Sequence, residues 1–164
     1  MASEETNEPL EIEVQQILEE ARMVLPGLQA LFGFQLIVVF NERFEHALGA
    51  VGRELHLCAA VLTALAIGLI MAPAAYHRQA ERGRVSRYFA NYASRLITLA
   101  MAPLLLALSV EVSLVAFVVL GNTAVSSLIG SSLMLFLVWL WYFLPTYRRW
   151  RQALSSQKSP RSRA

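Results

Sequence analysis

Four long apolar segments separated by polar links dominate the pattern of hydrophobic and polar positions along the chain. They are Met23 to Phe40, Leu55 to Ala75, Leu96 to Leu120 and Ala124 to Leu144. Crossing a hydrocarbon core of about 30 Å takes about 20 helical residues, so each segment is long enough to span a bilayer. Barrel strands would alternate apolar and polar residues, and these segments do not. The pattern predicts an all-α integral membrane protein, a bundle of four transmembrane helices. The expected spans are 26–44, 54–76, 92–120 and 123–145.

The segment before the first span has a helical pattern of its own. Its apolar residues recur at steps of three and four, which places them on one helical face, and they are Leu10, Val14, Ile17, Leu18, Ala21, Val24 and Leu25. The glutamates mostly lie off that face. We therefore expect an amphipathic cytoplasmic helix over residues 10–25, after a disordered acidic start at 1–9. Pro26 is expected to begin the spanning helix at an angle, because proline is tolerated in a first helical turn.

Charge along the chain predicts the orientation of the spans. Residues 1–25 hold seven Glu and one Arg, whereas residues 77–164 hold eleven Arg or Lys and two Glu. Short links rich in Arg and Lys stay in the cytoplasm, which applies to the link 77–91 and to the basic tail 148–164. Both termini are then cytoplasmic, and the other two links lie outside. The glutamates near the N-terminus do not argue against a cytoplasmic N-terminus, because acidic residues contribute little to this rule.

Composition narrows the class of protein further. Apolar residues make up 56% of the 164 and charged residues only 16%, against about 25% charged in soluble domains. No phosphate-binding glycine loop, nucleophile elbow or zinc-protease helix is visible, so we expect no enzymatic activity, no cofactor and no nucleic-acid partner. The start lacks the features of a cleaved secretory signal. Cys58, the single cysteine, is expected to be a small apolar side chain.

Several runs of residues are similar to those of a known family. They are Leu25-Pro26-Gly27-Leu28-Gln29-Ala30-Leu31-Phe32-Gly33-Phe34-Gln35-Leu36, then Ala72-Pro73-Ala74-Ala75-Tyr76-His77-Arg78, and Trp141-Tyr142-Phe143-Leu144-Pro145. Over roughly residues 15–147 the chain resembles an uncharacterised family of small bacterial four-span membrane proteins, catalogued as a domain of unknown function. The resemblance implies the architecture and a bacterial inner membrane. It implies no activity and no catalytic residues.

Glu111 is the first candidate for chemistry, because it lies inside the third span toward the outside. A carboxylate at that depth is costly unless it is paired, protonated or hydrated. The candidate partners from the outer side are Arg43, Arg53 and His56. Two interpretations stay open: a buried pair that holds helices together, and a group that lines an ion or proton path.

Other polar residues near the spans could take part. His56 could form an acidic outer vestibule with Glu42, Glu45, Glu54 and Glu111, since negative rings attract cations. Gln35 lies on nearly the opposite face of its helix from Gln29. At the inner side, His77 is a candidate pH sensor and Arg95 a candidate ion-pair partner. The three histidines do not have the spacing of a zinc site, so no metal site is expected.

Two hypotheses of different classes follow. The first is an ion or proton pathway built by several identical subunits, because four spans enclose little room and a pore forms more easily between protomers. The second is a non-catalytic structural or accessory subunit of a larger membrane assembly, with residues 10–25 as the possible contact with a partner protein.

Overall fold

The computed structural model describes residues 8–80, 86–148 and 150, and within these ranges the side chains of residues 8, 9, 43, 45 and 80 are not described. The described chain folds into α1 (Glu8–Val38), α2 (Glu42–Ala80), α3 (Arg87–Leu120) and α4 (Thr123–Val138), followed by the π-helical turn η1 (Trp139–Phe143). No strand occurs in these ranges. Four helical segments are long and apolar enough to cross a membrane, the fourth being α4 with η1 and the helical residues up to Arg148, which confirms the predicted four-span, all-α fold.

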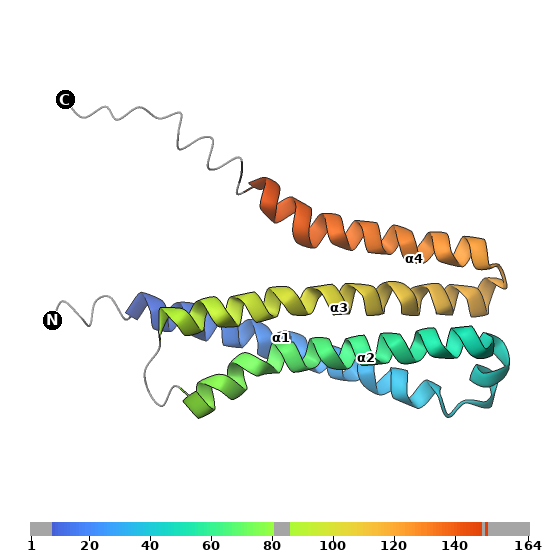
Figure 1. Cartoon of the computed structure of the whole chain (residues 1–164), viewed down its shortest axis with the longest axis horizontal. Helices are drawn as coiled ribbons and strands as arrows, with labels where there is room; N and C mark the ends of the chain where they lie inside the picture. The colour runs from blue at the N-terminus through green and yellow to red at the C-terminus, as the bar shows by residue number, and fades with distance from the viewer. Residues whose placement is uncertain (1–7, 81–85, 149, 151–164) are drawn as a thin grey trace.

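The helices run alternately back and forth (Figure 1), so α1 begins and α4 ends at the same end of the bundle. We call the end that holds the α1–α2 and α3–α4 links the linker end, and the opposite one the terminal end. Helices α1, α2 and α3 pack closely together, whereas α4 contacts mainly α3 and diverges from it toward the terminal end (Figure 1). Much of α4 is therefore left to face lipid.

A separate amphipathic helix over 10–25 is not shown. Residues 10–25 are the first part of one helix, α1, which continues through Pro26 to Val38. The expected apolar face does find a partner, since Leu10 and Val14 pack against Phe89, Ala90 and Ala93 of α3. At about 1.5 Å per residue, a helix of 31 residues is about 46 Å long and exceeds the hydrocarbon core, so one end projects beyond it.

The second helix contains a sharp break at Gly49. This residue has φ 59° and ψ −172°, a backbone region essentially confined to glycine. The break turns the first residues of α2, 42–48, back against the rest of the bundle (Figure 1). We call residues 42–48 the fold-back segment. The region that sequence analysis assigned to the end of the first span and the following link is thus a short helical segment held against the bundle.

The bundle core is apolar toward the terminal end. Its buried residues come from α1, α2 and α3 and are Ala21, Leu28, Ala66, Ile70, Ala100 and Leu104. The buried polar residues lie toward the linker end, where Gln35, His56, Thr63, Ser109 and Ser126 are packed among apolar residues such as Leu48 and Leu114. The polar half of the core is where the candidate site lies.

Candidate functional site

Three helices bring one polar side chain each to the same place. Gln35 lies in the last turn of α1, which ends at Val38, His56 lies in α2 beyond the break at Gly49, and Glu111 lies in α3. Glu111 precedes the end of α3 at Leu120 by nine residues, which is about 13 Å along the helix axis. The site therefore lies below the linker end, within the bundle.

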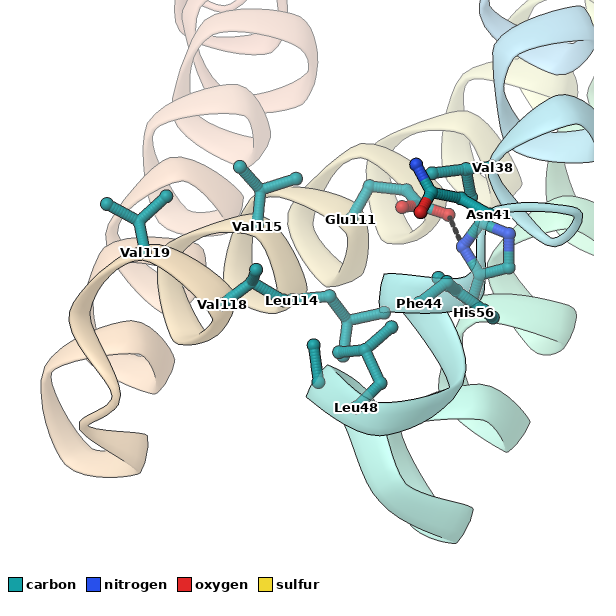
Figure 2. A pocket seen from close by; sticks show the side chains of 11 residues that line it. Val38, Asn41, Phe44, Leu48, His56, Glu111, Leu114, Val115, Val118 and Val119 are labelled. Carbon is teal, nitrogen blue, oxygen red and sulfur yellow. Dashed lines mark ion pairs between the residues drawn. The ribbon is translucent and has the colours of Figure 1, made fainter.

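These side chains form a closed set of hydrogen bonds. The His56 Nδ1 atom lies 2.9 Å from Glu111 Oε1 (Figure 2). The Gln35 side-chain amide donates to the same Glu111 oxygen over 2.9 Å. The second ring nitrogen of His56, Nε2, lies 2.9 Å from the main-chain carbonyl oxygen of Gln35. Each residue thus contacts the other two, and the cluster ties α1, α2 and α3 together.

The hydrogen-bond partners determine how many protons the cluster holds. The Gln35 carbonyl oxygen can only accept, so His56 Nε2 must carry a hydrogen and donate it. Between His56 Nδ1 and Glu111 Oε1 a second hydrogen is needed, on the ring as an imidazolium or on the carboxyl as a neutral acid. Without it, two lone pairs would face each other across 2.9 Å. The pair therefore holds one shared proton and is neutral as a whole.

Burial strengthens this pairing. The side chain of His56 is 5% exposed and that of Glu111 17%. An isolated charge there would be costly, whereas a neutral, hydrogen-bonded pair is not. One buried acceptor, Gln35 Oε1, has no hydrogen-bond partner.

A pocket of about 250 Å³ lies beside the pair (Figure 2), and its polar lining consists of Asn41, His56 and Glu111. The remaining walls are apolar and are formed by Val38, Phe44, Ala47, Leu48, Leu114, Val115, Val118 and Val119. Glu111 and His56 therefore both line an otherwise apolar chamber.

The fold-back segment forms one side of the pocket. The rings of Phe44 and His56 meet edge to face, in a T-shaped arrangement with centroids 4.9 Å apart. Leu48 is buried and lines the same chamber. Because the break at Gly49 directs this segment back toward His56, the pocket depends on a backbone conformation that glycine provides.

The other predicted residues lie elsewhere. Glu42, Arg53 and Glu54 are exposed, and the side chain of Arg43 lies outside the described residues. Glu42 and Glu54 are therefore not part of the buried cluster. Of the partners expected for Glu111, the structure places His56 on its carboxylate. Arg95 is sixteen residues before Glu111 on the same helix, about 24 Å away along the axis, and so belongs to the terminal end.

His77 also lies at the terminal end, where its ring is 5.2 Å from that of Phe89. It lines a shallow pocket together with residues of α1 such as Glu11, Gln15 and Arg22. In the described part of the chain, no group of three or more His, Cys, Asp or Glu side chains could hold a metal ion.

The members of the cluster were predicted from the sequence, but its geometry was not. Gln35, His56 and Glu111 were all candidates, yet nothing in the sequence predicted the hydrogen bond between the Gln35 amide and the Glu111 carboxylate. It also missed Phe44 and Gly49. The signal that was available is the pair Gly49 and Gly52 between two stretches of helical character, which marks a point where the backbone can turn.

The chain matches a known protein family. A family model described as a family of unknown function (DUF6328) matches residues 3–145. No curated protein and no solved structure matches the chain.

Proposed function

Since the chain belongs to the DUF6328 family of unknown function, we propose that it forms a homo-oligomeric, channel-like pathway for ions, with the proton as the favoured species. In this proposal the His56–Glu111 pair is the proton-binding step. The protein acts as a multi-pass protein of the bacterial inner membrane and has no enzymatic activity.

The contact between His56 Nδ1 and Glu111 Oε1 is the observation that carries the proposal. A proton carrier needs a group that takes up and releases a proton, at a place that protons from solution can reach. With one proton between Nδ1 and Oε1, the His56–Glu111 pair can serve as such a group, and a pocket lies beside it. Ionisable residues inside a membrane span are typical of proton relays.

The homo-oligomeric part of the proposal rests on the terminal half of the bundle. Its buried core, from Ala21 and Leu28 to Ala100 and Leu104, is apolar, so a proton that leaves the pair has no polar relay through the centre of the described protomer. We propose that the second half of the pathway runs between protomers. The exposed face of α4, which packs mainly on α3, is available for such a contact.

Reconstitution into liposomes tests this function. The purified chain is incorporated into vesicles that carry an internal pH-sensitive dye, and a potassium gradient with valinomycin sets the voltage. We expect proton flux above that of empty vesicles, lost in Glu111→Gln and retained in Glu13→Gln. Glu13 is exposed on the first part of α1 and provides the same chemical change away from the pair. Flux equal to that of empty vesicles, or unaltered by Glu111→Gln, would refute the proposal.

The orientation forms part of the same proposal. The Arg-rich link between α2 and α3 supports a cytoplasmic terminal end, because short cytoplasmic links retain positive charge. The linker end, with the pocket, then faces the outside. A proton would enter the pair from the outer side.

One observation favours the second candidate function, a non-catalytic accessory subunit. The glutamates on the first part of α1 remain exposed, although its apolar face is packed on α3; they are Glu11, Glu13, Glu19 and Glu20. An exposed acidic face suits a basic surface of a partner protein. Co-purification from the native membrane separates the two functions, because a stable homo-oligomer without any partner argues against the accessory role.

A further inference from the structure

We propose that the pocket beside the His56–Glu111 pair binds a small apolar amine in its protonated form, and that binding displaces the proton shared by the pair. The inference rests on the proposed function for its proton-binding pair and names a second substrate class, a monovalent organic ammonium, for the same site.

The shape and lining of the pocket define one end of the ligand. Eight of its eleven lining residues are apolar, and the cavity measures about 250 Å³. It is therefore smaller than most ligand pockets, which run from about 300 to 1,000 Å³. An alkyl or a single aryl group matches this chamber.

The polar base of the pocket defines the other end of the ligand. Asn41, His56 and Glu111 are the polar lining residues, and Glu111 is the one that can carry negative charge. A cation beside this carboxylate, with an apolar body against Leu114 and Val115, makes both contacts at once. Phe44 lines the same chamber and adds an aromatic ring, a surface that attracts ammonium groups.

The proton count determines what must happen when such a cation enters. Before binding, the pair is neutral with one shared proton, and the free amine carries one positive charge. After binding, His56 is neutral with its hydrogen on Nε2, Glu111 is a carboxylate, the ammonium sits beside it, and one proton is in solution. Total charge is conserved at plus one. Retention of the shared proton would instead leave the buried ammonium without a compensating negative charge, which is costly.

The same geometry selects for an ammonium with an N–H group. Once the shared proton has left, the lone pair of His56 Nδ1 faces Glu111 Oε1 across 2.9 Å. An N–H group that donates to either atom from the pocket relieves this repulsion. A quaternary ammonium has no hydrogen to donate, so it leaves the two acceptors facing each other. We therefore expect a preference for protonated amines.

The other ionisable groups near this end do not substitute for the pair. From α2, Glu42, His46, Arg53 and Glu54 are exposed, and water screens their charges. Neither α1 nor α3 contributes another described ionisable side chain to the pocket lining. Among the described residues, the His56–Glu111 pair is therefore the source of a proton released on binding, whereas the side chains of Arg43 and Glu45 lie outside the described residues.

Proton release on amine binding provides the test. Purified protein in detergent, in a weakly buffered solution with a pH indicator, is titrated with benzylammonium, benzyltrimethylammonium and benzyl alcohol. Calorimetry under the same conditions measures binding. We expect saturable benzylammonium binding with release of one proton for each cation bound. We also expect at least about tenfold weaker binding of the quaternary analogue, which is 1.4 kcal/mol. Binding of benzylammonium without proton release would overturn the inference, and so would equal binding of the alcohol.

Two variants separate the pair from the pocket. Glu111→Gln removes the charge and should abolish both binding and release, whereas Glu13→Gln should leave both unchanged. Ala47 is an exposed residue of the fold-back segment that lines the pocket. Ala47→Leu should fill part of the pocket without altering the pair, and should weaken benzylammonium binding at least about tenfold. Benzylammonium binding that survives both Glu111→Gln and Ala47→Leu would contradict the inference.

The outcome is distinguishable from failure of the proposed function. If the protein conducts protons in liposomes but binds no benzylammonium, the exchange of amine for proton is refuted and the proton pathway stands. If it binds the amine with proton release but carries no proton flux, the proton pathway is refuted and the exchange site stands.

Discussion

The imidazole of His56 is held between two acceptors, the carboxylate of Glu111 at 2.9 Å and the main-chain carbonyl of Gln35 at 2.9 Å. This arrangement connects a residue of the first span with one of the third through the second. It also leaves the pair neutral as a whole, with one proton between Nδ1 and Oε1. The stability of the bundle and its proposed chemistry both depend on this proton.

Replacement of Glu111 by Gln should cost little stability. Once the Gln35 amide turns over, the amide nitrogen of a glutamine at this position can donate one hydrogen to His56 Nδ1 and the other to Gln35 Oε1, so it imitates the protonated form of the pair. We expect a loss within about 1 kcal/mol, the net value of one hydrogen bond. Glu111→Ala should cost about 2–4 kcal/mol, because it strands two buried polar groups and leaves a cavity. Thermal unfolding in detergent measures both, and a Glu111→Gln protein as unstable as Glu111→Ala would contradict this.

Gly49→Ala should loosen the fold-back segment. Because Gly49 has φ 59° and ψ −172°, an alanine there is strained by about 1–3 kcal/mol even though its Cβ would meet no neighbouring atom. The matched control is Gly68→Ala in the same helix, where the site is also open. In a regular helix this change should stabilise by about 0.5–1 kcal/mol. Amide hydrogen exchange of residues 42–48 measures the effect and should be faster in Gly49→Ala than in Gly68→Ala. Equal protection in both variants would count against the predicted strain.

Gly130→Ala should disturb the packing of α4 on α3. A Cβ at Gly130 would collide with the side chain of Ser113 and approach the Ser109 carbonyl oxygen to 2.7 Å. Overpacking of this kind costs about 1–3 kcal/mol. Gly33→Ala is the control, since its Cβ would meet nothing within 4 Å. A Gly130→Ala protein whose melting temperature equals that of the control would show that α4 does not approach α3 as closely as described.

Cysteine labelling in intact cells should reveal the orientation. In a Cys58→Ala background, Glu54→Cys places a thiol at the linker end and Arg78→Cys one at the terminal end, both at exposed positions. If the Arg-rich link is cytoplasmic, a membrane-impermeant maleimide should label the first thiol and not the second until the cells are opened. The reverse pattern would place both termini outside.

The sequence was sufficient to predict the number of helices, because long apolar segments leave few alternatives to membrane spans. It was insufficient around Pro26, where a separate cytoplasmic helix was expected to end and α1 instead continues as one helix. Proline removes one backbone donor but need not break a helix whose two halves both pack on neighbours, as Ala21 and Leu28 do. Tertiary contact thus overrode the local signal.

The candidate site was predictable as a set of residues but not as a geometry. Glu111 drew attention because a lone carboxylate in a span needs a partner, and His56 was among the candidates. The choice between His56 and the arginines depended on the break at Gly49, which sets how the start of α2 lies against α1 and α3. Such a tertiary arrangement leaves no periodic signal in the chain.

The protonation of His56 is the most direct test of the shared proton. Nitrogen-15 NMR of labelled imidazoles, with His46→Gln and His77→Gln to assign the signals, reports which ring nitrogen carries hydrogen. We predict a hydrogen on Nε2 in the folded protein, because this nitrogen faces the Gln35 carbonyl oxygen. We also predict a second hydrogen between Nδ1 and the Glu111 carboxyl, so that Nδ1 does not give the signal of a bare acceptor nitrogen. A ring with its only hydrogen on Nδ1, or an Nδ1 that faces no hydrogen, would contradict the shared proton.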